Sequence, residues 1–135
     1  MKKIVFPVLC LVLFVISCQP DPVDPPPSNR DNILGKWHLD RDYSEYYQPA
    51  TVLVDYEEYI GEPEDSIVFK RNNIAVAYPE SEEMEYHFVN DSTISVDDEE
   101  YKIRKLTSTE LYLYQEEINT ATNEKWIARG YLSRP

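Results

Sequence analysis

The 135-residue chain has few of the residues on which catalytic or cross-linked domains depend: two cysteines, two histidines and three glycines. Three glycines cannot build a phosphate-cradling loop, and no serine stands in a G-x-S-x-G nucleophile elbow. Nucleophilic catalysis needs a base aligned on a nucleophile, and His38 and His87 both fall on the polar side of their strand patterns. The acidic runs also lack the D-x-D-x-D-G spacing of a calcium loop. We therefore expect a protein that is not an enzyme and uses no metal or cofactor.

Positive charge is scarce as well. Thirteen Lys and Arg residues stand against 25 Asp and Glu residues, giving a formal net charge of −12 at pH 7. A field of this sign repels phosphate backbones, so we expect no nucleic-acid partner. It permits a neutral or cationic ligand, or a basic patch on another protein.

The one long apolar run, residues 4–16, opens the chain and follows Lys2 and Lys3. It is shorter than the roughly 20 residues that span a bilayer. A positive segment followed by a short apolar run is typical of an export signal, which we place at residues 1–17.

The signal ends in "VISCQP", which resembles the lipobox of bacterial lipoproteins. The resemblance implies that Cys18 becomes the lipidated N-terminus and anchors the chain to the membrane; a plain secretory signal is the alternative. Cys10 would leave with the signal, so no internal disulfide can form. Gln19 follows Cys18 where an aspartate would argue for inner-membrane retention, which favours the outer membrane. We expect an exported protein, lipid-anchored to the cell envelope.

Residues 18–32 contain five prolines and show no alternating pattern. This composition is typical of an extended polyproline spacer or of disorder. We interpret the segment as a tether between the lipidated cysteine and a folded domain at residues 33–135.

From Ile33 onward, apolar residues alternate with polar ones in short runs separated by turn residues, which predicts antiparallel strands. Eight such runs joined by short links can close into a barrel and so remove both sheet edges; an open, curved meander is the alternative. The residues that share the inward side in this prediction are Ile33, Gly35, Trp37, Leu39, Ile67, Phe69, Ile74, Val76, Tyr78, Met84, Tyr86, Phe88, Ile94, Val96, Tyr101, Ile103, Leu111, Leu113, Trp126, Ala128, Gly130 and Leu132.

One connection is long, from Asp42 to Asp65. Within it, "TVLVDYEEYI" fits a strand and a short helix about equally well. Long segments in compact β domains are usually functional or disordered, and the tyrosines and aliphatics here argue against disorder. We expect this segment to lie over the mouth of the barrel.

The strand "ILGKWHLD" resembles the G-x-W first strand of lipocalins, and "YKIRKLTSTELYLYQ" resembles the later strands of lipocalin-like domains in small bacterial envelope lipoproteins. The resemblance implies an all-β, eight-stranded antiparallel up-and-down barrel. It also implies that many members hold small apolar ligands. Lipocalins commonly pack an arginine over the G-x-W tryptophan. Arg134 shares the side of Leu132 and Arg129 does not, so we expect Arg134 to cap Trp37 beside Gly35 where the barrel closes.

Two functional hypotheses follow. The first is non-catalytic binding of a small apolar or neutral ligand beneath the 42–65 segment. The second is an interaction module without a pocket, which docks an envelope protein, surface protein or glycan through its acidic surface and loop tyrosines. The candidate contact residues for both are the tyrosines Tyr46, Tyr47, Tyr56, Tyr59, Tyr78 and Tyr86.

Overall fold

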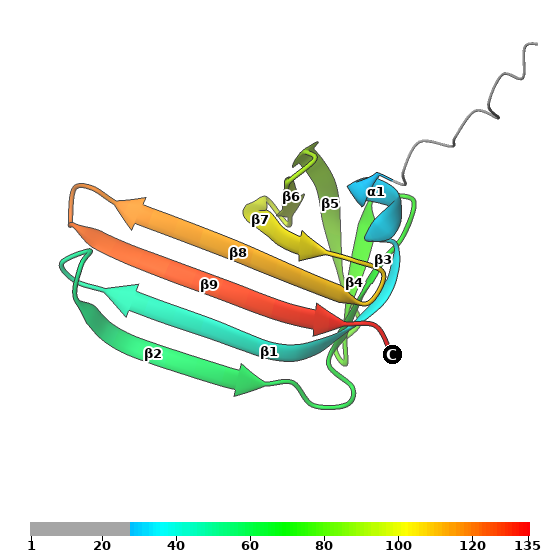
Figure 1. Cartoon of the computed structure of the whole chain (residues 1–135), viewed down its shortest axis with the longest axis horizontal. Coiled ribbons are helices and arrows are strands. Elements are labelled where there is room, and N and C mark those ends of the chain that lie inside the picture. The colour runs from blue at the N-terminus through cyan, green and yellow to red at the C-terminus, as the bar shows by residue number, and fades with distance from the viewer. Residues whose placement is uncertain (1–27) are drawn as a thin grey trace, which may run out of the picture.

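A single antiparallel sheet, closed on itself, makes up the folded part of the protein (Figure 1). The structure is a computed structural model that describes residues 28–135; the predicted export signal, Cys18 and most of the predicted tether lie outside this range. The elements in the described range are α1 (Asn29–Asn32), β1 (Gly35–Tyr47), β2 (Leu53–Ile60), β3 (Ser66–Phe69), β4 (Ile74–Tyr78), β5 (Glu82–Asn90), β6 (Thr93–Val96), β7 (Glu99–Leu106), β8 (Glu110–Asn119) and β9 (Glu124–Ser133).

The barrel consists of eight strands, β1 and β3 to β9. Each strand from β3 to β9 pairs with the next along the chain, and β1 pairs with both β3 and β9. The β1–β9 pairing closes the ring, so the expected eight-stranded antiparallel barrel is confirmed and the open meander is excluded. This up-and-down closed barrel is the architecture that lipocalins have.

β2 is a ninth strand, outside the ring. β1 is 13 residues long, and its two halves have different neighbours on one side. Residues 35–38 pair with β3, whereas residues 41–47 pair with β2. β8, β9, β1 and β2 therefore continue past the barrel as a four-stranded sheet, seen in Figure 1 as the long blade opposite α1. We call it the sheet extension.

The sheet extension corrects the expectation of a loop over the barrel mouth. The segment from Asp42 to Asp65 is a β-hairpin followed by a short link, and of the two alternatives for residues 51–60 the strand is the one that forms. The β-branched and aromatic residues of this stretch suit a strand surface, and pairing with β1 satisfies the backbone on one side.

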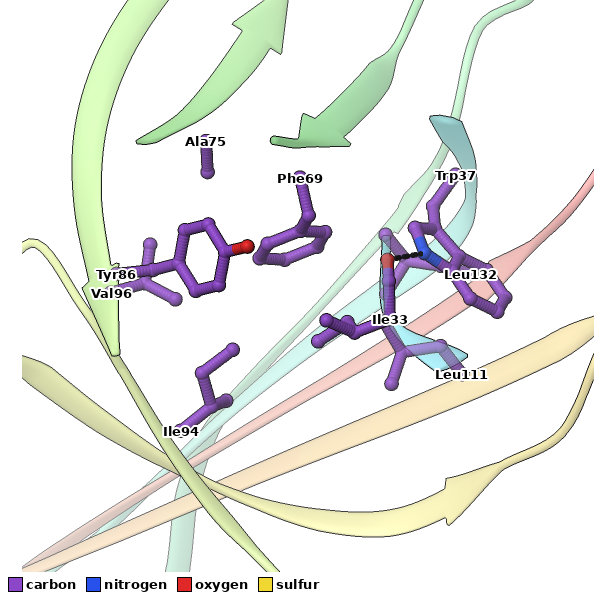
Figure 2. Packing of buried hydrophobic residues seen from close by; sticks show 9 residues of the cluster. All are labelled: Ile33, Trp37, Phe69, Ala75, Tyr86, Ile94, Val96, Leu111 and Leu132. Atoms are coloured by element: carbon purple, nitrogen blue, oxygen red, sulfur yellow. Dashed lines mark hydrogen bonds between the residues drawn. The ribbon is translucent and has the colours of Figure 1, made fainter. Parts of the chain in front are cut away.

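The core fills the end of the barrel nearest to α1, which we call the closed end. Figure 2 shows nine of its buried side chains, which come from most of the strands and from the link after α1. Trp37, Ile33 and Ile94 are fully buried, and Phe69 meets Tyr86 edge to face with ring centroids 5.0 Å apart. Met84, Phe88, Tyr101, Ile103 and Leu113 pack against this cluster, as their strand patterns predict.

Ile33 is buried, but it does not belong to a strand. Residues 29–32 form the short helix α1 where an extended tether was expected, and β1 begins at Gly35 rather than at Ile33. The Gly35 backbone has φ +108°, a conformation that favours glycine. This turn lets the chain bend into the barrel and places Ile33 under its closed end.

The predicted inward side of β4 is wrong. Ala75 faces the core and pairs with Phe69, and Ala77 pairs with Ile67, so Val76 and Tyr78 lie on the opposite side of β4 from the core cluster. Val76 is nevertheless buried there. Two small residues leave room for the Phe69 and Tyr86 rings inside. Tyr78 is 40% exposed.

Trp126 is not a core residue, which corrects a second prediction. It is 40% exposed because its part of β9 has passed the end of the barrel, where no opposite wall covers it. Trp126 does lie on the predicted side of β9, which is the side of Leu132.

Candidate functional site

The closed end of the barrel holds three residues that the sequence singled out. The guanidinium carbon of Arg134 lies 4.3 Å from the centroid of the Trp37 ring, and its Nη2 donates to the carbonyl oxygens of Asn32 and Leu34. The Trp37 Nε1 donates to the Ile33 carbonyl at 2.7 Å. These contacts tie the chain on both sides of Gly35 to the end of β9. The arrangement fixes the closure of the barrel at this end, with Trp37 fully buried under Arg134.

An apolar mouth lies at the other end of the interior. Leu39, Ile67, Ala77 and Leu132 line a hollow of about 260 Å³ whose rim includes Tyr59 and Tyr78. The Tyr59 hydroxyl donates to Asp65 Oδ2 at 2.6 Å, and this bond raises the pKa of Tyr59 to about 12. The hydroxyl thus stays protonated, so the rim is polar but uncharged at the tyrosine.

From the mouth, the inner face continues along the sheet extension in rows that cross all four strands. Leu113, Gly130, Asp42 and Tyr59 are in register, followed by Gln115, Ala128, Ser44 and Glu57. The outermost row is Glu117, Trp126, Tyr46 and Asp55. In the second and third rows, the middle strands carry small residues or the aromatic pair, and the outer strands carry acidic and amide side chains.

These rows enclose a cleft of about 460 Å³, which we call the acidic trough. Trp126 and Tyr46 form an aromatic platform at its far end, with ring centroids 5.0 Å apart and planes tilted by 31°. The Tyr46 hydroxyl donates to Glu124 Oε1 at 2.8 Å and lies 3.1 Å from Gln48 Oε1, which fixes the ring beside Trp126. An exposed, braced aromatic pair is a surface on which a flat or apolar ligand group can stack.

The charge of the acidic trough has one sign. Of the residues that line it, Glu45, Asp55, Glu57 and Glu117 are acidic, and none of the described lining residues is Lys or Arg. Glu45 is compensated, because it accepts from Arg129 Nη1 at 2.8 Å on the outer side of the sheet. The remaining carboxylates give the trough a negative potential, which favours a neutral or cationic ligand.

Asp42 lies on the inner face between the mouth and the acidic trough. Asp42 is exposed at the surface, but partial desolvation of its carboxyl group raises the pKa above the ordinary value, although the Tyr43 backbone N–H partly opposes this shift. The pKa of Tyr101 is raised mainly by burial, and the charge of Asp42 adds to this shift. A partly desolvated carboxylate on a concave surface is a typical feature of a binding site.

The outer face of the sheet extension carries a different tyrosine group. Tyr112 stacks on Tyr131 with centroids 4.4 Å apart, Tyr131 meets Tyr43 edge to face, and Tyr43 touches Tyr56. Tyr47 is on the same side, under the Lys125 ammonium group. These rings hold the four strands of the sheet extension together, as cross-strand aromatic pairs do.

The six candidate tyrosines therefore do not form one site. Tyr46 lies in the acidic trough, Tyr56 reaches its edge, and Tyr59 and Tyr78 both line the rim of the mouth. Tyr47 faces the other way. Tyr86 is buried and donates its hydroxyl proton to the Lys70 carbonyl at 2.6 Å, so it is a core residue. Cys18 lies outside the described residues.

Sequence reasoning missed the contribution of Trp126, Asp42 and Asp55 to the concave face. A signal was present in the length of the hairpin between β8 and β9. Each strand has 10 residues, whereas β3, β4 and β6 have four or five, so their ends had to project beyond the barrel.

Two further searches cover residues 28–135. No group of three or more His, Cys, Asp or Glu residues there is arranged to hold a metal ion. No helix in the same range has the length and apolar character needed to cross a membrane.

Comparison with known proteins gives a distant structural likeness. No family model matches the chain, and no curated protein sequence matches it. Among solved structures, the chain is similar to a deswapped triple mutant of bovine odorant binding protein, with 14% identity over 77% of this chain and 74% of that chain and a TM-score of 0.39. The fold assignment rests on the strand pairing described above.

Proposed function

We propose that this protein binds a small ligand without catalysis, on the concave surface formed by the apolar mouth and the acidic trough. The observation that carries the proposal is the braced aromatic pair of the half-buried Tyr46 and the exposed Trp126, which lines a cleft of about 460 Å³. Pockets that hold small molecules are typically concave and partly aromatic, with a few polar groups that fix orientation. Catalysis is left out because the sequence motifs offer no nucleophile–base pair.

The chemistry of the surface describes the ligand. The mouth, lined by Leu39, Ile67 and Leu132, suits an apolar group. The acidic trough suits a neutral or positively charged group next to Trp126. The ligand is therefore a small molecule with an apolar body, and any charge it carries is positive.

The second hypothesis, docking of a protein or glycan by a module without a pocket, is less well supported. It requires a filled and featureless concave side, whereas the mouth and the acidic trough are both hollow. The exposed tyrosines that it used are divided between two faces of the sheet.

The N-terminal sequence supports a proposal for the cellular location of the protein. The lipobox-like "VISCQP" supports an exported lipoprotein whose Cys18 is acylated and whose binding domain is held at the outer membrane. Radiolabelled fatty acid should enter the wild-type chain and not a Cys18→Ser variant. Equal labelling of both would contradict the anchor without touching the binding proposal.

The binding proposal is tested by mass spectrometry of small molecules that co-purify with the full chain. The wild type should carry a stoichiometric apolar passenger, and Trp126→Ala should lose most of it. Tyr131→Ala is the matched control, because it removes an exposed ring from the outer face of the same strand. No passenger in the wild type, or equal loss in both variants, would count against the concave site.

A further inference from the structure

A free sheet edge runs along β2. In the described part of the chain, β2 pairs only with β1, and its other side has no strand next to it. Exposed large hydrophobic side chains gather there: of the eleven among the described residues, six lie between residues 52 and 60. They are Val52, Leu53, Val54, Tyr56, Tyr59 and Ile60.

The backbone of this edge is available for strand addition. The Tyr56 N–H donates to the carboxylate of Asp55, not to β1, so it points outward. The Gly61 N–H donates to the Asp40 carbonyl, so it points toward β1. Because backbone groups alternate along an antiparallel strand, those of Tyr56, Glu58 and Ile60 face away from the sheet. No described strand pairs with these groups, and an edge of this kind is a template for another strand. A strand added there would replace the Asp55 carboxylate as the acceptor of the Tyr56 N–H.

The charges of β2 decide which strand can be added. Asp55 and Glu57 lie on the inner face, and Glu58 lies on the outer face, where Arg41 Nε is 3.3 Å from its carboxylate. Antiparallel pairing with a second copy centred on Tyr56 would bring Asp55 against Glu57 on one face. Like charges opposite each other destabilise a strand pair, whereas opposite charges stabilise it by roughly 0.2–1 kcal/mol.

We propose that β2 is a docking edge for an extended basic segment of another protein, which adds to the sheet as an antiparallel strand. The segment alternates Lys or Arg with aliphatic or aromatic residues. Its basic side chains face Asp55 and Glu57, and its apolar side chains lie beside Tyr56 and Ile60 on the outer face. This edge shares Asp55, Tyr56 and Glu57 with the acidic trough but does not include the Tyr46–Trp126 platform. Trp126→Ala, which should lose the small ligand, should therefore leave peptide binding intact.

The probe is a synthetic eight-residue peptide that alternates lysine and valine, with a glutamate–valine peptide of equal length as control. Added to the full chain, the basic peptide should slow amide hydrogen exchange at Tyr56, Glu58 and Ile60. The acidic peptide should bind about tenfold more weakly or not at all, because two opposite-charge pairs become like-charge pairs. No protection on β2, or equal binding of both peptides, would overturn the proposal.

Two variants make the test specific. Tyr56→Pro removes the outward N–H without breaking the β1 ladder, and proline is tolerated on the open side of an edge strand. It should abolish peptide binding, whereas the matched Tyr56→Val, which keeps the N–H, should retain it. Binding that survives Tyr56→Pro would show that strand addition is not the mode.

A charge-reversed chain covers the case in which the proline variant does not fold. Asp55→Lys combined with Glu57→Lys should exchange the preference, so that the acidic peptide now protects β2. An unchanged preference would overturn the charge argument. Concentration-dependent dimerisation of the wild type through β2 without peptide would overturn the proposal, because the occupant of the edge would then be a second copy of this chain.

Discussion

The guanidinium carbon of Arg134 lies 4.3 Å from the centroid of the Trp37 ring, and this contact joins the last described strand to the first. The same side chain donates to the Asn32 and Leu34 carbonyl oxygens on either side of Ile33. The closed end is thus held by one cation, one indole and a turn of backbone. This leaves the opposite end and the sheet extension for binding.

Arg134→Ala should reduce the free energy of unfolding by about 2–3 kcal/mol, from the lost cation–π contact and the lost charged hydrogen bonds. For a domain of this size the melting temperature should fall by roughly 10 °C. Thermal unfolding followed by circular dichroism measures the effect. Arg134→Lys keeps the charge but not the planar guanidinium group, so its melting temperature should lie between those of the wild type and Arg134→Ala. An unchanged melting temperature in Arg134→Ala would contradict the structural role of this arginine.

Gly61 packs against the backbone of Leu39. A Cβ placed at residue 61 would lie 1.7 Å from the Leu39 carbonyl oxygen, which cannot move without disturbing β1. Gly61→Ala should destabilise the protein by roughly 1–3 kcal/mol, measured by urea unfolding. Gly130→Ala is the control, because the nearest atom to its added Cβ is a flexible Leu132 carbon at 3.7 Å. Equal stability of Gly61→Ala and wild type would contradict the close packing.

The Tyr59–Asp65 hydrogen bond at the rim of the mouth joins β2 to the residue that precedes β3. Its contribution to stability should be lost at both high and low pH. It raises the pKa of Tyr59 from 10.0 to about 12, so its contribution is complete below pH 10 and is lost as pH rises through about 12. It also lowers the pKa of Asp65 below 3.8, so the contribution is lost again as pH falls below that value. Asp65→Asn should return the Tyr59 pKa toward 10, measured as tyrosinate absorbance against a Tyr59→Phe control. Titration near 12 in Asp65→Asn would refute the assignment.

Asp42 should be a cost to folding at neutral pH. The residue is exposed, so the effect is small, but partial desolvation of its carboxyl raises its pKa in the folded state above 3.8. Its stabilising contribution is therefore present below that pH and is lost as pH rises through the folded pKa. Asp42→Asn should therefore be more stable than wild type at pH 7, with the difference vanishing below pH 3.8. Urea unfolding at both pH values checks this. A less stable Asp42→Asn at pH 7 would mean that the carboxylate has a favourable partner.

The sequence predicted most of the barrel because its patterns are local. Ile94, Leu111 and Leu132 follow strict alternation with short links, and Asn73 provides the positive φ of the turn after Lys70. Alternation failed in β4, where Ile74, Ala75, Val76 and Ala77 are all apolar, so the inward side depended on the space left by Phe69 and Tyr86.

The concave site was less accessible to sequence reasoning. The side on which Trp126 lies could be predicted, but its exposure depends on where the opposite wall of the barrel ends. The bulge of β1 between Leu39 and Arg41 places Asp42, Ser44 and Tyr46 on the inner face. A single extra residue of this kind leaves no reliable mark in the pattern.

Binding on the concave surface is measured most directly with three probes that have similar alkyl chains and head groups of different charge: octanol, octyltrimethylammonium and octanoate. Each is titrated into the full chain while Trp126 fluorescence is followed. Trp37 is fully buried and Trp126 is 40% exposed, so Trp126 is the reporter. Octanol and octyltrimethylammonium should change its emission at saturable concentrations, and octanoate should bind about tenfold more weakly because of the trough carboxylates. Saturable binding in which octanoate is the tightest probe, or no binding by any of the three, would contradict the account.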